Sequence, residues 1–355
     1  MEYEIWLSSV RLSNENKLEL LDYFGSSKDL WYYVIKQQNN KHLINQEIYD
    51  KLTAAWDRAK IDEDIKKMKD ENISLVRYDE EDYPEKLLNI SSFPLYLYYI
   101  GDIKSLNKTA AAIVGSRDCT PYGRDVTIEI SHALCSNGVN IISGMARGID
   151  GIAHREALSR GFTCAVLGCG IDVIYPKENK DIYNKIRKKG CLISEFPLGE
   201  PPNAYNFPQR NRLISGLSEL IIVVEGNEKS GSLITAAAAL DQGRDVMAVP
   251  GSIFSPKSKG PNKLIKDGAA PYTKPDDLFD ALHIDYEYKE ENNHIKYTNK
   301  EKAILKYLDF NPIHIDEIIR KSNIDIKELY RLLFELQMKN AVECINGNFY
   351  TRLKS

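Results

Sequence analysis

Between residues 109 and 283 the chain repeats one pattern, in which a short apolar run leads into a glycine-bearing loop and then into a stretch with helical periodicity. Apolar runs that alternate with amphipathic helices indicate a parallel sheet covered by helices on both faces. The predicted strands are Ala110–Val114, Val139–Ile142, Thr163–Leu167, Cys191–Glu195, Leu220–Val224 and Asp245–Val249. The predicted helices are Tyr122–Asn137, Asp150–Arg160, Lys180–Lys189, Pro208–Leu217 and Leu233–Gln242.

The segment before this α/β region has a different pattern. Apolar positions between Leu18 and Phe24 recur with helical spacing and stop at Gly25, a common end signal for a helix. A charged helix is expected at Ile61–Asn72, and the aromatic and apolar residues between 83 and 99 suggest a strand laid against the following domain. We predict a helical domain over residues 1–65 and the α/β domain over residues 66–283.

The segment after the α/β region begins with residues 284–297, which are polar and charged and are typical of a linker. Three helices and a hairpin follow, and three helices before a small hairpin is the layout of a winged helix, which we predict over residues 298–355. The helices are expected at Lys300–Leu308, Ile315–Lys321 and Ile326–Lys339, and the hairpin at Val342–Cys344 and Phe349–Thr351.

The loops that follow the predicted strands carry the candidate chemistry. In an open parallel sheet the carboxyl ends of the strands lie along one edge, so these loops are expected to meet there. Glycine lets the backbone approach a ligand closely, helix N-termini present N–H donors to anions, and basic side chains add charge. The candidate phosphate-binding residues in the loops are Gly115, Ser116, Arg117, Ser143, Gly144, Arg147, Gly148, Tyr175, Lys177, Ser230, Gly231 and Ser232.

Each of these candidates has a structural alternative. Arg117 could be solvated beside a tight turn, Tyr175 could be a packing residue beside a proline, and Asp150 is better explained as a helix cap than as a ligand. The helix start at Arg210, Asn211 and Arg212 is a further candidate, because arginine near a helix N-terminus is unfavourable unless an anion offsets it. Glu195 and Glu219 are possible internal partners for these arginines.

Composition and charge fit a globular protein, with 43% hydrophobic and 28% charged residues and a net charge of −4. The acidic excess lies outside residues 109–283, where acids and bases nearly balance, so composition neither supports nor excludes a nucleic-acid partner. The apolar runs are far shorter than a membrane span, no secretion signal is evident, and the six cysteines form no CxxC pair. We expect free thiols and a cytoplasmic location.

Fingerprints of catalysis are missing from the sequence. The segment from Gly226 to Thr235 imitates a Walker A loop but has Ser232 directly after Gly231, where the motif requires lysine. His132 and His154 have no second histidine or carboxylate at metal-ligand spacing, and no nucleophile–base arrangement is evident. We expect no catalytic residue, no metal and no cofactor, and a site that binds its ligand without chemical reaction.

Taken together, the motifs closely resemble those of the DNA-processing protein A family, also called DprA or Smf. The shared segments span about 109–283 in one order. They are the Gly115-Ser116-Arg117 turn, the loop from Ser143 to Asp150, the Tyr175-Pro176-Lys177 loop, the helix from Phe207 to Ser218, the segment Ser230 to Ala236 and the segment Gly243 to Gly251.

This resemblance implies an extended Rossmann-like domain that binds single-stranded DNA without strong sequence preference. It implies a helical SAM-like or helix-hairpin-helix domain before it and a winged helix after it. It also implies a homodimer, with delivery of the recombinase RecA onto strands covered by single-strand-binding protein during natural transformation. By position, the DNA contacts are expected at Arg117 and Lys177, with Ser116, the Gly144 turn and the helix from Arg210 to Arg212 lining the groove.

Two other functions remain open at this point. A nucleotide phosphoribohydrolase of the lysine-decarboxylase-like group also has a Rossmann domain with a GSR-like turn, but that group carries a PGGxGTxxE loop whose glutamate is absent from residues 230–237. Alternatively, the winged helix could read a double-stranded operator. Its third helix mixes Lys327, Arg331 and Lys339 with Glu328 and Glu335, so it is not a strongly basic recognition helix.

Overall fold

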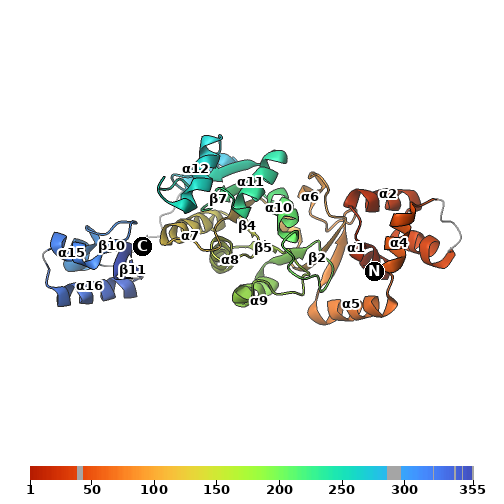
Figure 1. Ribbon diagram of the computed structural model, residues 1–355, viewed down its shortest axis with the longest axis horizontal. Helices are drawn as coiled ribbons and strands as arrows, with labels where there is room; N and C mark the ends of the chain where they lie inside the picture. Colours follow the sequence, from red (N-terminus) through yellow and green to blue (C-terminus); the bar gives the residue numbers. More distant parts are fainter. Residues whose placement is uncertain (38–42, 286–296, 323, 340, 346, 354–355) are drawn as a thin grey trace.

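The computed structural model describes residues 1–37, 43–285, 297–322, 324–339, 341–345 and 347–353. The chain is elongated, and its three parts follow one another along the long axis, with the N-terminal helices and the winged helix at opposite ends of the α/β domain (Figure 1). Most of the predicted linker, residues 286–296, lies outside the described residues. None of the described helices combines the length and apolar character that crossing a membrane requires.

The central sheet has nine strands in the order β1-β2-β6-β5-β4-β3-β7-β8-β9. Neighbouring strands from β6 through to β9 are parallel, so the predicted parallel sheet is confirmed for this part, and all six predicted strands are present. The bounds are β1 Ser74–Arg77, β2 Tyr96–Gly101, β3 Ala110–Val114, β4 Asn140–Ser143, β5 Thr163–Val166, β6 Cys191–Ser194, β7 Leu220–Val223, β8 Asp245–Ala248 and β9 Ala270–Pro271.

One edge of the sheet departs from the prediction of a purely parallel sheet. Strand β2 runs antiparallel to both β1 and β6, which makes the sheet mixed. The strand expected within residues 83–99 is confined to β2, because the first part of that segment forms the short helix α6 (Glu85–Leu88). Strand β1 is too short and too polar to stand out in the sequence, since only Val76 of its four residues is buried.

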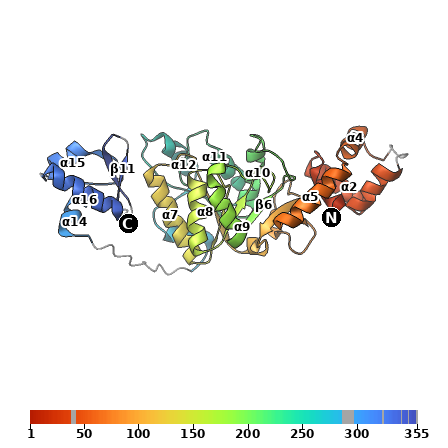
Figure 2. The ribbon, with the colours of Figure 1, turned by 90° about the horizontal axis from the view of Figure 1, so that it is seen from below.

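Helices cover both faces of the sheet. On one face α7 (Pro121–Ser136), α8 (Ile149–Arg160) and α9 (Lys180–Lys189) lie side by side (Figure 2). On the other face α10 (Asn206–Gly216) and α11 (Gly231–Asp241) pack together. Three apolar clusters fill the spaces between the sheet and these helices, one on the face of α10 and α11 and two on the opposite face. The remaining elements are α12 (Lys259–Lys266), α13 (Asp276–Leu282) and the 3-10 turns η2 (Lys104–Asn107), η3 (Lys177–Asn179) and η4 (Pro256–Ser258).

The N-terminal part is helical, as expected. Its core contains Trp6, whose indole N–H donates to the carbonyl of Leu52 at 3.0 Å, and Gly25 ends α2 in the left-handed conformation. The Ser8 and Tyr98 hydroxyls, 2.7 Å apart, join this part to strand β2 of the sheet. Its elements are α1 (Glu2–Ser9), α2 (Asn14–Phe24), α3 (Ser27–Trp31), the π-helical turn η1 (Tyr32–Gln37), α4 (Gln46–Ala54) and α5 (Arg58–Glu71).

The C-terminal part has the predicted winged-helix architecture, with an additional short strand before its second helix. Strand β10 pairs with β12, so the hairpin becomes a three-stranded sheet in the order β10-β12-β11. Arg124 of α7 forms a bidentate ion pair with Glu343 of β11, at 3.2 and 2.8 Å, which joins this part to the α/β domain. Its elements are α14 (Asn299–Leu305), β10 (Ile313–His314), α15 (Ile315–Ser322), α16 (Ile326–Met338), β11 (Val342–Ile345) and β12 (Phe349–Arg352).

Candidate nucleic-acid interface

Two adjoining hollows lie at the carboxyl edge of the parallel strands. The larger, of about 490 Å³, is bounded by the loops after β3 and β7, which flank the point where the strand order changes direction. The smaller, of about 180 Å³, is bounded by the loops after β3, β4 and β5. Ligands of open α/β sheets bind at such a switch point, so this edge is the candidate site. The two hollows share Arg117, Ala146, Phe207 and Arg210, and they therefore form one groove.

The loop after β3 is held in a tight turn that leaves Arg117 exposed. The Ile149 N–H donates to the carbonyl of Ser116 at 3.2 Å, and the Ser116 hydroxyl donates to the carbonyl of Asp118 at 2.8 Å. A Cβ at Gly115 would lie 2.7 Å from the side chain of Ile149, so glycine is required for this close approach. The Arg117 guanidinium lies 5.8 Å from the centre of the Phe207 ring, and within the described part of the chain it makes no salt bridge.

The loop after β4 is closed by Asp150, whose carboxylate accepts from the N–H groups of Gly144 at 3.1 Å and Ala146 at 3.4 Å. The helix cap is Gly148, so the interpretation of Asp150 as a helix cap is wrong: it lies inside the first turn and ties the loop to it. Burial raises the pKa of the Asp150 carboxyl above its ordinary value. Ser143 is fully buried and donates to the carbonyl of Ile113 at 2.7 Å, so it positions the loop from inside.

Basic and aromatic side chains rim the smaller hollow. Tyr175 is 38% exposed, and its ring centre lies 5.6 Å from that of Phe207. Arg147 is exposed and lies 3.5 Å from Glu178, a distance and exposure at which an ion pair contributes little to stability. Lys177 follows the lining residue Pro176 and is exposed; within the described residues it has no ion-pair partner. Arg117 therefore lines the groove, whereas Lys177 is exposed between the lining residues Pro176 and Glu178 and belongs to the lining of neither hollow.

The two arginines near the start of α10, Arg210 and Arg212, bond mainly to groups inside the domain. Arg210 is 4% exposed and donates to the carbonyls of Gly144, at 2.8 Å, and Val166. Burial lowers the pKa of Arg210 to about 10, and the nearby Asp150 carboxylate opposes that shift. Arg210 therefore supports the floor of the groove and ties the ends of β4 and β5 together.

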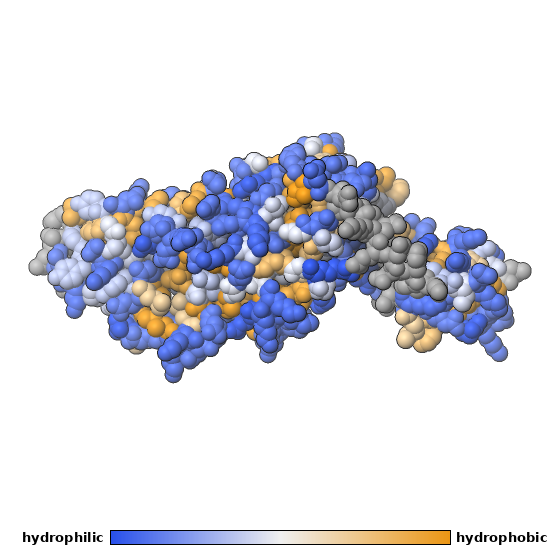
Figure 3. Space-filling model, turned by 180° about the vertical axis from the view of Figure 1, so that it is seen from behind, coloured by the Kyte–Doolittle hydropathy of each residue, from blue (hydrophilic) through white to orange (hydrophobic). Residues whose placement is uncertain are grey.

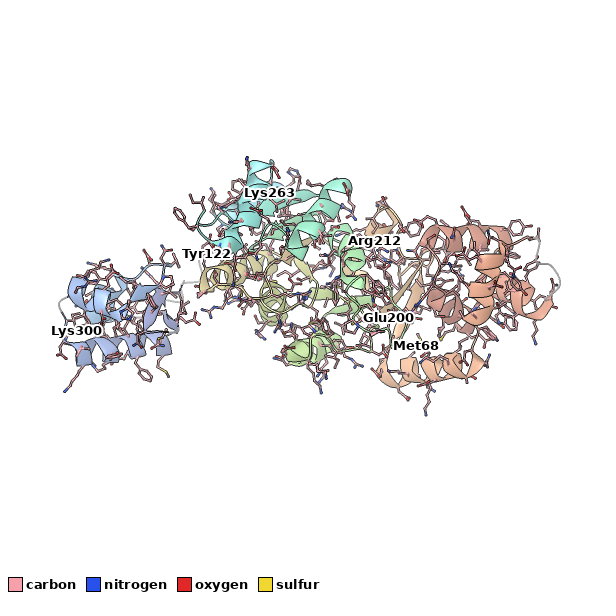
Figure 4. The ribbon with its side chains drawn as sticks, in the orientation of Figure 1. Met68, Tyr122, Glu200, Arg212, Lys263 and Lys300 are labelled. Carbon is pink, nitrogen blue, oxygen red and sulfur yellow. The ribbon has the colours of Figure 1, made fainter. Side chains whose placement is uncertain are left out.

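Arg212 lies away from the groove, toward the N-terminal helices (Figure 4). Its guanidinium pairs with the buried carboxylate of Glu195 at 2.5 Å, which is the structural alternative considered for this residue. The expectation that Arg212 lines the groove is therefore not met by its position. Asn211 is mostly buried, donates to the carbonyl of Gly231 at 3.3 Å and lines the larger hollow.

The loop after β7 leads to the N-terminus of α11 in the wall of the larger hollow. Ser230 caps α11 by accepting from the Ser232 N–H at 3.4 Å, and Ser230, Gly231 and Ser232 all line the hollow. A helix N-terminus carries a partial positive charge and unpaired N–H groups, which attract a phosphate. Lys229, on the same loop, is exposed and adds a full charge beside it.

Phe207 is one of the lining residues that the sequence reasoning did not single out, as is Lys229. Phe207 lies in both hollows, beneath the Arg117 guanidinium and beside Tyr175. A Cβ at Gly168 would lie 2.8 Å from the Phe207 ring, so a glycine in the loop after β5 makes room for it. The signal in the sequence was an aromatic residue three positions before Arg210, which only the fold places in the groove.

Two carboxylate side chains contribute to the lining of the two hollows. They are Asp150, which holds backbone N–H groups, and Glu178, which is exposed near Arg147. Across the described residues no group of three or more histidine, cysteine, aspartate or glutamate side chains is arranged to hold a metal ion. The six cysteines are free thiols, in agreement with the sequence.

Comparison with known proteins places the chain in a family. The model of the DNA recombination-mediator protein A family matches residues 74–283, and the DprA winged helix domain model matches residues 295–348. Protein Smf of Escherichia coli K12 is 33% identical over 100% of this chain and 96% of its own length. DNA processing protein DprA of Bacillus subtilis is 43% identical over 60% of this chain and 73% of its own length.

Two solved structures of proteins with the same family name have folds similar to that of this chain. DNA processing protein A from Streptococcus pneumoniae superposes with a TM-score of 0.69 and 34% identity, over 81% of this chain and 99% of that chain. The protein from Helicobacter pylori, described for its single-stranded DNA binding mode, superposes with a TM-score of 0.56 and 31% identity, over 61% of this chain and 97% of that chain. The chain therefore belongs to the DNA recombination-mediator protein A family, DprA or Smf.

Proposed function

We propose that the groove binds single-stranded DNA without strong sequence preference. The observation that carries this proposal is the pairing of cations from separate loops with two aromatic rings in one groove. Arg117, Arg147 and Lys229 line the hollows, Lys177 is exposed between the lining residues Pro176 and Glu178, and Phe207 belongs to both hollows with Tyr175 beside it. Cations follow the phosphates of any strand, and a ring stacks on any unpaired base, so neither feature depends on sequence. The single-stranded DNA binding named for the Helicobacter pylori relative supports the same assignment.

The proposed role is that of a recombination mediator that is not an enzyme. We infer that the protein acts in the cytoplasm as a homodimer and loads RecA onto single strands, including strands covered by single-strand-binding protein. Family membership supports this role. The lining supports the absence of catalysis, because Asp150 is occupied in holding a loop and lacks the freedom of a general base or nucleophile.

The test replaces the two exposed cations of the rim. Arg117→Ala and Lys177→Ala should each weaken the binding of a labelled poly-dT strand, measured by fluorescence anisotropy across a salt series. Each lost phosphate contact should reduce the slope of log K against log salt by about 0.7. The same variants should be slower in promoting RecA assembly on strands covered by single-strand-binding protein.

The control for this test is Arg155→Ala on α8, a cation outside both hollows. Circular dichroism should show all three variants folded. If both rim variants bind poly-dT with the affinity and salt slope of the unaltered protein, the groove is not the DNA site. If duplex DNA binds as tightly as the single strand, the preference for unpaired strands is wrong.

A further inference from the structure

A row of polar and basic side chains follows the outer face of α9, the helix that begins beside the smaller hollow. Its members are Lys177, in the turn before the helix, and Lys180, Asn184 and Lys188 within it. We call these four residues the α9 row. All four are exposed, and Figure 2 shows α9 on the outer side of the α/β domain, next to α8. None of the four belongs to the lining of either hollow, so the row is distinct from the groove itself.

The start of α9 is fixed to the wall of the groove. Asn179, the residue before the helix, is buried, and its side-chain amide donates to the carbonyls of Met145 at 2.9 Å and Ala146 at 3.0 Å. Ala146 lines both hollows, and Pro176 lines the smaller one. Because Lys177 follows Pro176 directly, the α9 row begins at the edge of the smaller hollow and leads away from it.

The spacing of the α9 row suits a phosphate backbone. Lys180, Asn184 and Lys188 are four residues apart, which places them along one side of the helix, whereas Ile182 and Ile186 on the other side are buried. Each step of four residues rises about 6 Å, comparable to the distance between successive phosphates of a strand. The Asn184 amide is itself a donor of the kind that binds phosphate oxygens, so the row has no gap between its two helical lysines.

The lysines of the row are not used inside the protein. Within the described part of the chain Lys177, Lys180 and Lys188 have no ion-pair partner, whereas Lys185 of the same helix lies 3.9 Å from Asp181. Lys188 is in the last turn, where a cation complements the helix macrodipole. Lys180 is in the first turn, where a cation opposes the macrodipole, so helix stability does not explain this residue. An anion bound between Lys177 and Lys180 would remove that conflict.

We propose that the α9 row is a second contact zone for single-stranded DNA, which receives the strand where it leaves the smaller hollow. The three lysines would neutralise phosphates, so the zone adds affinity without adding sequence preference. This inference rests on the proposed function of the groove. An acidic protein segment would meet the same charges, but the spacing of the row and its junction with the groove favour the strand.

The first test depends on strand length. The double variant Lys180→Gln, Lys188→Gln should bind a strand of about six thymidines as the unaltered protein does, because such a strand is short enough for the groove alone. It should bind a strand of about 20 thymidines at least fivefold more weakly at low salt. The slope of log K against log salt should be smaller by about 1.4 for the two lost contacts. Lys177 stays in place because its substitution belongs to the test of the groove.

The matched control is Lys302→Gln with Lys306→Gln on the winged helix. It removes two exposed lysines, and thus the same net charge, at one end of the molecule and away from α9 (Figure 1). The control should bind both strands as the unaltered protein does, and circular dichroism should show both double variants folded. Equal weakening of long-strand binding by the two double variants would mean that net charge alone is responsible, and it would overturn the inference.

The second test reports where the strand lies. In Asn184→Trp the fluorescence of the introduced indole, measured above the background of the three natural tryptophans, should be quenched by the long strand and unaffected by the short one. Phe334→Trp, at an exposed position of the winged helix, should respond to neither strand. An indole signal of Asn184→Trp that the long strand leaves unquenched overturns the inference. So does full affinity of the Lys180→Gln, Lys188→Gln variant for the long strand, because that outcome leaves the row to a different kind of partner.

These outcomes separate the inference from the proposed function. Arg117→Ala should weaken the binding of both strands, whereas the double variant of the α9 row should affect only the long one. If the unaltered protein fails to bind either strand, the proposed function fails. If Arg117→Ala weakens binding and the double variant does not, the groove keeps its function and the α9 row loses the one proposed here.

Discussion

At the scale of single residues, the arginines of this protein divide into two kinds according to their partners. Arg117 and Arg147 are exposed in the lining of the groove, whereas Arg210 is buried, Arg212 is partly buried, and both are bonded to groups inside the domain. Sequence cannot distinguish them, because all four lie in loops or helix starts at the same edge of the sheet. Whether an arginine is exposed or internally bonded depends on the direction in which the folded backbone points its side chain.

The Arg212–Glu195 pair gives a prediction at this scale. Arg212→Met should lower the free energy of unfolding by about 3–5 kcal/mol, because it leaves the buried Glu195 carboxylate without its partner. Glu195→Leu with Arg212→Met should recover most of that loss, since similar apolar replacements of buried ion pairs are often neutral. Urea denaturation measures both effects.

DNA binding by the folded double variant decides the role of Arg212. We expect its affinity for poly-dT to match that of the unaltered protein, because the side chain lies outside both hollows. If the double variant recovers its stability but loses DNA binding, Arg212 does contact DNA and the assignment made here is wrong. Burial raises the pKa of the Glu195 carboxyl in the folded state, so in the single variant stability should be lost as the pH rises from the ordinary pKa of a glutamate through the folded-state pKa, and should level off above it.

At the scale of elements, the groove is shaped by the contact between the loop after β3 and the start of α8. Gly148 has a φ of +69°, and a Cβ there would lie 2.2 Å from the Ser116 carbonyl oxygen and 2.8 Å from the Arg117 carbonyl. An added methyl group therefore has to push the Arg117 loop outward. The sequence indicates a glycine turn here, but the partner of that turn is 31 residues away, counted from Arg117 to Gly148.

Gly148→Ala should consequently lower both stability and affinity for poly-dT. The matched control is Gly243→Ala, since Gly243 has a similar φ of +67° and nothing within 4 Å of its Cβ position. The free energy of unfolding of the control should fall by only about 1–2 kcal/mol, the cost of an alanine in the left-handed conformation. Its affinity for DNA should be unchanged. Equal effects of the two substitutions would show that the close approach has no part in shaping the groove.

The elements show where sequence reasoning succeeds and where it stops. All six predicted strands and all five predicted helices of the α/β region are present, because their apolar periods are long and uninterrupted. The antiparallel β1–β2 edge was missed, since β1 buries one side chain and its partner strand lies about 20 residues away in sequence. Phe207 was missed as a site residue because nothing local tells a core aromatic from one that lines a groove.

At the scale of the whole molecule, an ion pair between Arg124 and Glu343 joins the winged helix to the α/β domain within the described residues. The bidentate pair between Arg124 and Glu343 is about one third exposed on both sides, so water and salt weaken it. Hydrophilic side chains cover most of the face of the molecule seen in Figure 3, with apolar side chains between them on the α/β domain. The position of the winged helix should therefore depend on ionic strength.

Glu343→Gln should move the winged helix away from α7 while leaving the fold of both parts intact. Small-angle X-ray scattering at low salt should show a larger radius of gyration for this variant, and the unaltered protein should approach the same value at about 0.5 M salt, where the Debye length falls to a few ångströms. Exchanging the charges, with Arg124→Glu and Glu343→Arg, should restore the smaller radius. A radius that is the same for all of these proteins at every salt concentration would mean that other contacts hold the winged helix.

The position of Phe207 has a consequence for the DNA itself. Because the ring belongs to both hollows, it stands as a partition that a strand spanning the groove has to pass. Two neighbouring bases would then lie on opposite sides of the ring and lose their stacking on each other. Unstacking costs less free energy for thymine than for adenine, so a strand bound as proposed would show at most a modest preference for flexible pyrimidine segments, which arises from stacking and not from readout of the base edges.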